Sequence, residues 1–311
     1  MRNHSPLFIA LLAAAGPLLA APQAYVPNEK TATVSIIDTA TDLRRGDIPI
    51  GQRPRGSAVD AAHLYLTDAK TGSLLIVDTA SGKLERTVRV GDSPEGVSIS
   101  ADGRLLAVAV EDDNSVVLLS APEGKELARI KVQGRNPEHA AFSPDGRWLY
   151  VSAEEAEQVD VVDVAARRQV ASVAVGKRPR GMGFLPDGRL VYVACEMAGK
   201  VYAIDVVKRR VVAEITAGEY PNGVAVHPDG KRVFVSNGRS GTVMAIDVAS
   251  NTIVGTVGVG TRPWNMALTP DGAKLYVANG RSNNVSVIDT ASFTKLGDIE
   301  VGELPWGVSI R

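Results

Sequence analysis

The residues best suited to polar chemistry in this sequence stand directly after a recurring proline. Glu138 and His139 are adjacent, and Arg180 occupies the position of Glu138 in the next copy of the pattern. A carboxylate beside an imidazole can hold or pass a proton, and a guanidinium can stabilise a developing anion. His139, Glu138 and Arg180 are therefore the candidates for catalysis, although no catalytic motif surrounds them.

Two tryptophans share this position with the charged residues. Trp264 and Trp306 follow the proline in adjacent copies. Aromatic rings beside arginine suit a planar ligand or a partner surface, and packing over a channel mouth is the alternative explanation. The candidate ligand- or partner-binding residues are Arg53, Arg55, Arg135, His139, Arg178, Arg180, Arg239, Arg262, Trp264, Arg281 and Trp306.

The sequence contains few residues that could bind a metal or carry out redox chemistry. Its histidines beyond the first few residues are His63, His139 and His227, which occupy unlike positions, and no Cys/His spacing suits zinc or haem. We therefore predict no metal and no cofactor. Cys195 is the sole cysteine, so an intramolecular disulfide is excluded, and a packed small residue is favoured over a reactive thiol.

A repeat positions all of these candidates. The pattern Gly-x-x-Pro-x-(Gly/Asn/His) returns at intervals of 40 to 43 residues. A period of this length is typical of one four-stranded propeller blade, and seven copies predict seven blades. The copies begin at Gly51, Gly91, Gly134, Gly176, Gly218, Gly260 and Gly302.

Within one repeat, alternating β-branched runs are separated by turn residues, which indicates strands. In the clearest copy these runs are 223–227, 232–236, 242–247 and 252–259, with an Asp-Gly turn after the first. Most copies also end the third run with aspartate. We interpret these aspartates as caps of the following turn and not as catalytic carboxylates.

The two ends of the chain complete one blade. The stretch 305–311 supplies only a first strand, and the chain from Tyr25 supplies the second, third and fourth. Before this, a basic start, an apolar run and small residues predict a cleaved signal peptide over 1–24 and export to the periplasm. Residues 25–311 then form a single domain, an all-β seven-bladed propeller of four antiparallel strands per blade, closed by a blade shared between the termini.

Tyr276-Val-Ala-Asn279 and Tyr25-Val-Pro-Asn28 stand where one propeller class carries Tyr-Val-Thr-Asn. Over its whole mature length the chain resembles the YVTN-repeat β-propellers, and it lacks the Gly-His and Trp-Asp dipeptides of WD40 repeats. With one exported ring, it resembles the propeller proteins associated with pyrroloquinoline-quinone (PQQ)-dependent alcohol catabolism. This resemblance implies a periplasmic partner, namely a quinoprotein dehydrogenase, a cytochrome or a transport component, and an indirect association with PQQ enzymes.

The face that carries the Gly-x-x-Pro loops is the expected functional face, because loops on a rigid scaffold carry binding residues. We expect a basic arc and a shorter acidic sector on it, which would steer a charged partner; keeping the protein soluble is the alternative explanation. The acidic sector comprises Glu111, Asp112, Asp113, Glu154, Glu155 and Glu157. The basic arc comprises Lys30, Arg53, Arg55, Lys70, Lys177, Arg178, Arg180, Arg239, Arg262 and Arg281.

Three functions fit these observations. The favoured one is a non-catalytic, monomeric binding or scaffold protein that holds a protein partner or small ligand at the channel mouth. The second is a lactonase-like hydrolase, since other seven-bladed propellers hydrolyse lactones with Arg, His and acidic residues at that place. The third is a nucleic-acid-binding YVTN propeller, which the net charge of −1 and the predicted export do not favour.

Overall fold

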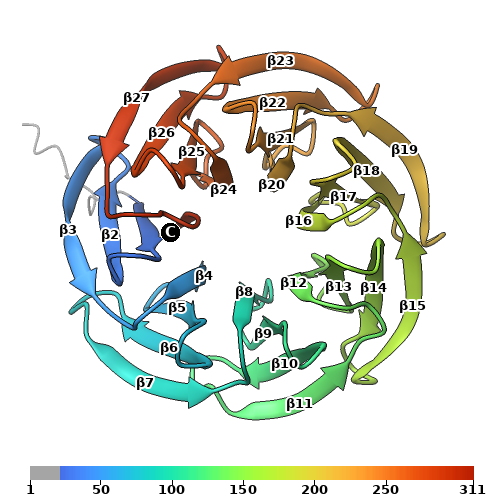
Figure 1. Cartoon of the computed structure of the whole chain (residues 1–311), viewed down its shortest axis with the longest axis horizontal. Coiled ribbons are helices and arrows are strands. Elements are labelled where there is room, and N and C mark those ends of the chain that lie inside the picture. Colours follow the sequence, from blue (N-terminus) through green and yellow to red (C-terminus); the bar gives the residue numbers. More distant parts are fainter. Residues whose placement is uncertain (1–21) are drawn as a thin grey trace, which may run out of the picture.

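The computed structural model describes residues 22–311 and shows seven four-stranded antiparallel sheets arranged as blades around a central axis (Figure 1). Two cavities lie along this axis, which we call the channel. The predicted seven-bladed β-propeller is confirmed. The predicted signal peptide falls almost wholly outside the described residues. The first strand, β1(Gln23–Asn28), begins at Gln23, so the fold starts slightly before the expected boundary at Tyr25.

Each of the six uninterrupted blades runs outward from the channel in chain order. The innermost strands are β4(Pro54–Val59), β8(Pro94–Ile99), β12(Pro137–Phe142), β16(Pro179–Phe184), β20(Pro221–Val226) and β24(Pro263–Leu268). The second strands are β5(His63–Asp68), β9(Leu105–Val110), β13(Trp148–Ala153), β17(Leu190–Cys195), β21(Arg232–Asn237) and β25(Lys274–Asn279).

The outermost strand of each blade is mostly exposed, whereas the third strand is mostly buried. The third strands are β6(Ser73–Asp78), β10(Ser115–Ser120), β14(Gln158–Asp163), β18(Lys200–Asp205), β22(Thr242–Asp247) and β26(Asn284–Asp289). The outermost strands are β7(Leu84–Arg89), β11(Glu126–Lys131), β15(Arg168–Ala174), β19(Arg210–Thr216), β23(Thr252–Gly258) and β27(Thr294–Glu300).

The seventh blade joins both termini, as the sequence predicts. Its order is β28(Ser309–Ile310), β1, β2(Thr33–Asp38) and β3(Leu43–Pro49). The amide of Gln23 donates to the carbonyl of Arg311 at 2.7 Å, and the reverse bond measures 3.0 Å. The innermost strand is short, with one further bridge between Asn28 and Pro305. Pairing the two ends of the chain in one sheet removes an open seam from the ring.

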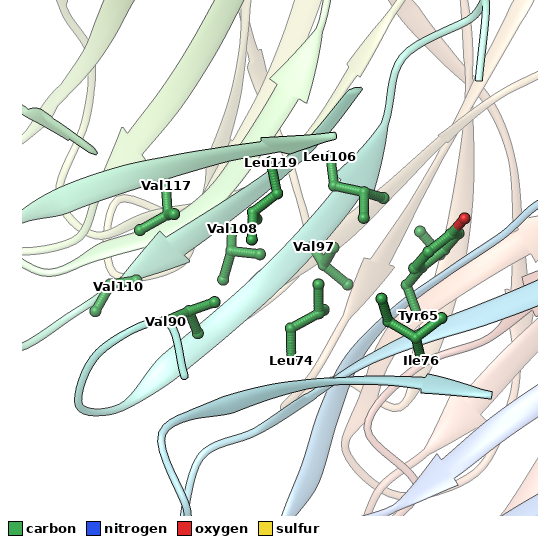
Figure 2. Close-up of a cluster of buried hydrophobic side chains, with 11 residues drawn as sticks. Tyr65, Leu74, Ile76, Val90, Val97, Leu106, Val108, Val110, Val117 and Leu119 are labelled. Atoms are coloured by element: carbon green, nitrogen blue, oxygen red, sulfur yellow. The ribbon is translucent and has the colours of Figure 1, made fainter. Parts of the chain in front are cut away.

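The core lies between neighbouring blades and not within one. Figure 2 shows one such cluster, in which Tyr65 and Ile76 from one blade pack against Leu106 and Val108 of the next. The alternation of the strands places these β-branched and aromatic side chains on the faces that meet. Burying each of them contributes about 1.5–3 kcal/mol, so the stacked blades hold the channel loops on a rigid base.

The predicted turn caps are confirmed on the face that carries the Asp-Gly turns. Asp247 Oδ1 accepts hydrogen bonds from the amide and the hydroxyl of Ser250 at 2.8 and 2.7 Å. Asp289 makes the same pair of bonds with Ser292. These carboxylates therefore have a structural role, because each accepts hydrogen bonds from a serine of its own turn.

Candidate functional site

The seven residues that follow the recurring proline all line one polar cavity at the channel mouth. Six of them are the second residues of the innermost strands, and the seventh, Trp306, precedes β28. The cavity has a volume of about 230 Å³. Around the ring its post-proline residues are Arg55, Glu95, Glu138, Arg180, Asn222, Trp264 and Trp306. One repeat position thus supplies seven side chains of four types to a single site.

Contacts between neighbouring blades fix where these residues lie. The Ser236 hydroxyl accepts from the amide of Gly223 at 2.8 Å and donates to the carbonyl of Trp264 in the next blade at 2.6 Å. Thr67 donates in the same way to the carbonyl of Glu95 at 2.5 Å. The blades approach so closely that a Cβ added to Gly223 would lie 2.5 Å from the Trp264 carbonyl oxygen. Glycine is required here for this approach, and the backbone at the mouth is rigid.

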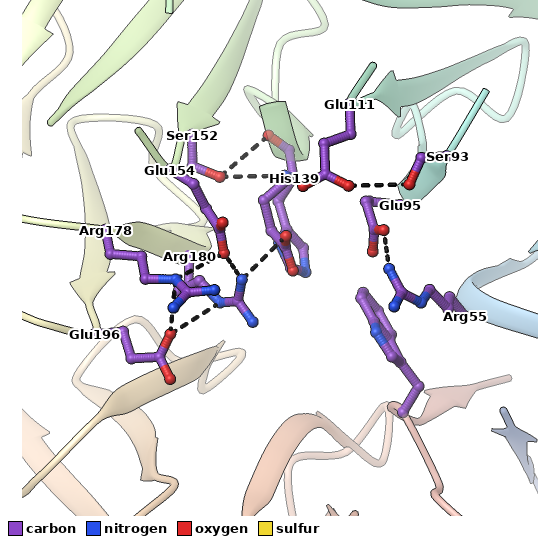
Figure 3. A network of polar contacts seen from close by, with 12 residues as sticks. Arg55, Ser93, Glu95, Glu111, His139, Ser152, Glu154, Arg178, Arg180 and Glu196 are labelled. Atoms are coloured by element: carbon purple, nitrogen blue, oxygen red, sulfur yellow. Dashed lines mark hydrogen bonds and ion pairs between the residues drawn. The ribbon is translucent and has the colours of Figure 1, made fainter. Parts of the chain in front are cut away.

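On one side of the cavity, arginines and glutamates form a branched ion-pair network (Figure 3). Arg180 Nη1 pairs with Glu154 and lies 3.1 Å from Glu138 Oε2. Arg178 Nε lies 3.0 Å from Glu154 Oε1 and 3.2 Å from Glu196 Oε2. Because the carboxylates are buried, each arginine compensates charges that would otherwise be costly to remove from water.

A second and smaller group lies across the mouth. Arg55 pairs with Glu95 and with Glu29 Oε1 at 3.2 Å. Glu29 also accepts from Arg53 Nε at 2.5 Å, at the exposed rim. Glu111 is different, because it accepts a hydrogen bond from the Ser93 hydroxyl at 3.0 Å and has no cationic partner among the described residues.

The candidates for catalysis lie together, as their sequence position suggested. Burial opposes ionisation of Glu138, but Arg180 and then His139 and Arg55 outweigh it, so the pKa of Glu138 falls below its usual value. Burial lowers the pKa of His139, although Glu138, with Oε1 at 4.0 Å from its Nδ1, acts in the opposite direction. At neutral pH the pair is an ionised carboxylate beside a neutral imidazole.

His139 and Trp306 also form the floor of the cavity. Their rings stack across the channel, with centroids 5.4 Å apart and planes 19° apart. Below them lies a second cavity of about 150 Å³ whose wall includes Gly56, Gly96 and Gly181. Trp306 and Asn265 line both cavities, so they and His139 divide the channel into a charged outer chamber and a smaller inner one.

The structure separates the predicted binding residues into two sets. Arg55, Arg178, Arg180, Trp264 and Trp306 line the outer cavity, and His139 lies at its floor. The remaining ones lie outside this lining, toward the loops around it: Arg53, Arg135, Arg239, Arg262 and Arg281. Arg239 and Arg262 both lie over the ring of Tyr220, at 5.6 and 5.5 Å from its centroid, so their nearest aromatic partner is this tyrosine.

The expected division into a basic arc and an acidic sector is wrong at the mouth. Arg178 and Arg180 of the arc insert between Glu154 of the acidic sector and Glu196, a residue outside both groups. Opposite charges mix there because the loops that carry them converge on the channel, whereas the sequence places them a blade apart. Attraction between buried charges then favours alternation over segregation.

Several residues of the site were not predicted from the sequence. Glu29 and Glu196 occupy the position directly after the second strand, which Glu111 and Glu154 also occupy. Aligning that position in all seven repeats would have found them. The same position is Gly280 next to Trp264, where an added Cβ would lie 2.5 Å from the indole ring. The missing side chain makes room for the tryptophan.

Cys195 is fully buried in the core between blades, and burial raises the pKa of its thiol to about 12. It therefore stays protonated and acts as a packing residue. Within residues 22–311, no three His, Cys, Asp or Glu side chains are placed to hold a metal ion. In the same range no helix has the length and apolar character needed to span a bilayer.

Fold and site together define a seven-bladed β-propeller with a charged cavity at one mouth of its channel. The YNCE-like β-propeller family model matches residues 58–229, more than half of the chain. The chain belongs to the YNCE-like β-propeller family. A second family model, that of the seven-bladed β-propeller lactonases, matches residues 165–301. No curated protein matches the sequence.

Many solved structures share the fold. A chain of Kuenenia stuttgartiensis hydrazine synthase is 24% identical with a TM-score of 0.79, over 91% of this chain and 99% of that one. A functionally unknown protein from Desulfotomaculum acetoxidans is 18% identical with a TM-score of 0.82, over 93% and 98%. At these identities the likeness concerns the fold alone, because propellers carry many unrelated activities.

Proposed function

We propose that this protein is a non-catalytic binding propeller that holds a small ligand in the outer chamber at its channel mouth. The observation that carries the proposal is the convergence of all seven post-proline residues on one cavity, where they present side chains of four types. A residue needed only for the fold would recur, as the turn-capping aspartates do. Side chains that differ around a rigid ring are suited to recognise an asymmetric ligand.

The ion pairs between the arginines and glutamates of the cavity favour a binding function over hydrolysis. In a lactonase site built on these arginines, at least one guanidinium would be free to stabilise the carbonyl oxygen that becomes an oxyanion. Each arginine of the cavity lining already pairs with at least two glutamates: Arg55 with Glu29 and Glu95, Arg178 with Glu154 and Glu196, and Arg180 with Glu138 and Glu154. These arginines hold the site together and are not free to bind an anion.

A thermal-unfolding screen tests the binding function. The purified mature chain is heated with small alcohols, aldehydes, carboxylates, sugars and amines, one chemical class at a time. At least one class is expected to raise the melting temperature of the wild type and not that of Trp264→Leu, since a ligand of the folded state stabilises it by mass action. If no compound of any class shifts the wild type, the outer chamber is not a ligand site and the proposal fails.

The setting of this function is the second part of the proposal. The resemblance to the propellers of PQQ-dependent alcohol catabolism supports an exported protein that works beside quinoprotein oxidation. A tagged copy isolated from the periplasm is expected to bring with it a quinoprotein dehydrogenase, a cytochrome or a transport component. Recovery of the tagged chain from the cytoplasm with its residues 1–24 intact would contradict the export, and recovery without any of these partners would contradict the setting.

The lactonase alternative has one observation in its favour besides the family-model match, because His139, Glu138 and Arg180 do lie together. A panel of small lactones tests it, with His139→Ala and Glu138→Gln as controls. Turnover that both substitutions abolish would establish hydrolysis and remove the non-catalytic part of the proposal. Absence of turnover by the wild type is the expected result.

A further inference from the structure

The outer chamber carries more negative than positive charge. Five glutamates and three arginines line it. The three arginines are shared among ion pairs, whereas Glu111 has no cationic partner among the described residues and bonds only to the hydroxyl of Ser93. A half-enclosed chamber concentrates the field of its charges, so it attracts cations and repels anions.

Three of the five glutamates lie across the chamber from the indoles, whereas Glu29 follows β1 in the same blade as Trp306. Glu95, Glu111 and Glu138 come from the two neighbouring blades that begin with β8 and β12. Trp264 and Trp306 come from the blades of β24 and β28, on the other side of the ring (Figure 1). The carboxylates can bind a protonated nitrogen through charge-assisted hydrogen bonds, and the indoles can pack against an apolar or planar body that carries this nitrogen.

An independent observation indicates that a ligand belongs in this chamber. Asn222 lines it between the two walls and is only 3% exposed, yet its amide Nδ2 has no hydrogen-bond partner. Leaving a buried donor unpaired costs about 1–3 kcal/mol, so a hydrogen-bond acceptor is expected to satisfy it. The ligand therefore carries a polar atom besides its charged nitrogen, or brings a water molecule with it.

The dimensions and the ion pairs restrict the ligand further. A chamber of about 230 Å³ is smaller than the sites that hold drug-sized molecules, which begin at about 300 Å³. An amino acid would need a free arginine for its carboxylate, and the arginines of the lining are paired. A bare metal ion is not favoured, because no three His, Cys, Asp or Glu side chains of residues 22–311 converge on one point.

We infer that the outer chamber binds a small organic cation, a protonated amine with an apolar or planar body, with the nitrogen toward Glu95, Glu111 and Glu138 and the body against Trp264 and Trp306. This inference rests on the proposed binding function and names its ligand class. It assigns Glu111 the role of the free anionic partner and the two tryptophans the role of the apolar wall.

Three probes of nearly equal size and different charge test the inference: benzylammonium, benzyl alcohol and benzoate. Isothermal titration calorimetry at neutral pH and low salt measures their affinities for the mature chain. Benzylammonium is expected to bind at least about tenfold more tightly than benzyl alcohol, and benzoate more weakly than either, since the phenyl group is common to all three and only the cation is attracted by the carboxylates.

Matched variants locate the site. Glu111→Gln keeps the size of the side chain and removes its charge, and it is expected to weaken benzylammonium binding about three- to tenfold. Glu155→Gln is the control, because Glu155 lies on the same loop face but outside the chamber lining. Trp264→Leu is expected to weaken binding about tenfold and Trp264→Phe less, which separates loss of the aromatic face from a general loss of packing.

The outcomes distinguish the inference from the function on which it rests. Equal affinities for the three probes, or tighter binding of benzoate, would overturn the cation assignment while leaving a binding chamber in place. Absence of benzylammonium binding together with a melting-temperature shift by another chemical class would do the same. Equal weakening by Glu111→Gln and Glu155→Gln would move the site out of the chamber and overturn the inference.

Discussion

The two faces of the ring use the same repeat in opposite ways. On the face with the Asp-Gly turns, Asp247 and Asp289 make nearly identical bonds to a serine three residues later. On the other face, the residue after the proline changes from arginine to glutamate to tryptophan around one cavity. A position that is the same in most blades maintains the fold, whereas a position that varies among the blades is available for recognition.

The largest expected difference between the faces is in the free energy of unfolding that is lost when an arginine is removed. Arg180→Ala at the mouth leaves Glu138 buried without its arginine partner and Glu154 with Arg178 alone, so the free energy of unfolding is expected to fall by about 3–5 kcal/mol. Arg189→Ala breaks an exposed pair with Asp187 on the other face and is expected to cost less than about 1 kcal/mol. Urea unfolding of both variants measures the difference, and equal costs would contradict the distinction.

The same substitution of glycine is expected to act differently on the two faces. Gly223→Ala places a Cβ 2.5 Å from a backbone oxygen of the next blade, which is expected to cost about 3 kcal/mol by overpacking. Gly146→Ala lies in an Asp-Gly turn with open space around it, where only the left-handed backbone (φ +70°) opposes the methyl group, at about 1–2 kcal/mol. A larger loss for Gly146→Ala would show that the blades can separate at the channel.

The two faces are also expected to lose stability at different pH. Burial lowers the pKa of His139 in the folded protein below its ordinary 6.5, so the folded state binds fewer protons than the unfolded chain. The stability that this histidine contributes is present above pH 6.5 and is lost as the pH falls below it. The charged groups facing the imidazole are Glu138 and Arg180, with the Asn265 amide beside them.

His139→Gln checks this assignment. The wild type is expected to lose more unfolding free energy between about pH 7.5 and pH 5.5 than the variant does, as measured by urea titration at both values. An identical pH dependence in the two proteins would mean that His139 is not held neutral by its surroundings.

The smallest effect is expected for a single turn cap. The Ser250 hydroxyl and amide lower the pKa of Asp247 below its usual 3.8, so its contribution is present above pH 3.8 and is lost as the pH falls through the lowered value. Asp247→Ala is therefore expected to lower the melting temperature slightly at neutral pH, and by less as the pH falls below 3.8. The variant should bind benzylammonium as the wild type does, and a loss of binding would contradict the separation of the two faces.

Much of this protein followed from the sequence. The period of the Gly-x-x-Pro pattern, the alternating strands and the split repeat at the two ends gave the number of blades, their order and the closure of the ring. These features are local or periodic, and they recur in every repeat. The residues after the proline could also be singled out as site candidates, because they are the ones that break the repetition.

The partners of those residues depended on the tertiary structure. Nothing in the sequence indicates that Arg178 and Arg180 insert between glutamates of neighbouring blades, that His139 stacks on Trp306 from the opposite side of the channel, or that Asn222 is left without a partner. These contacts join residues up to about four repeats apart in the chain. Periodicity determines the place of a residue in its own blade, whereas the charge and size of its neighbours across the channel are decided only when the ring closes.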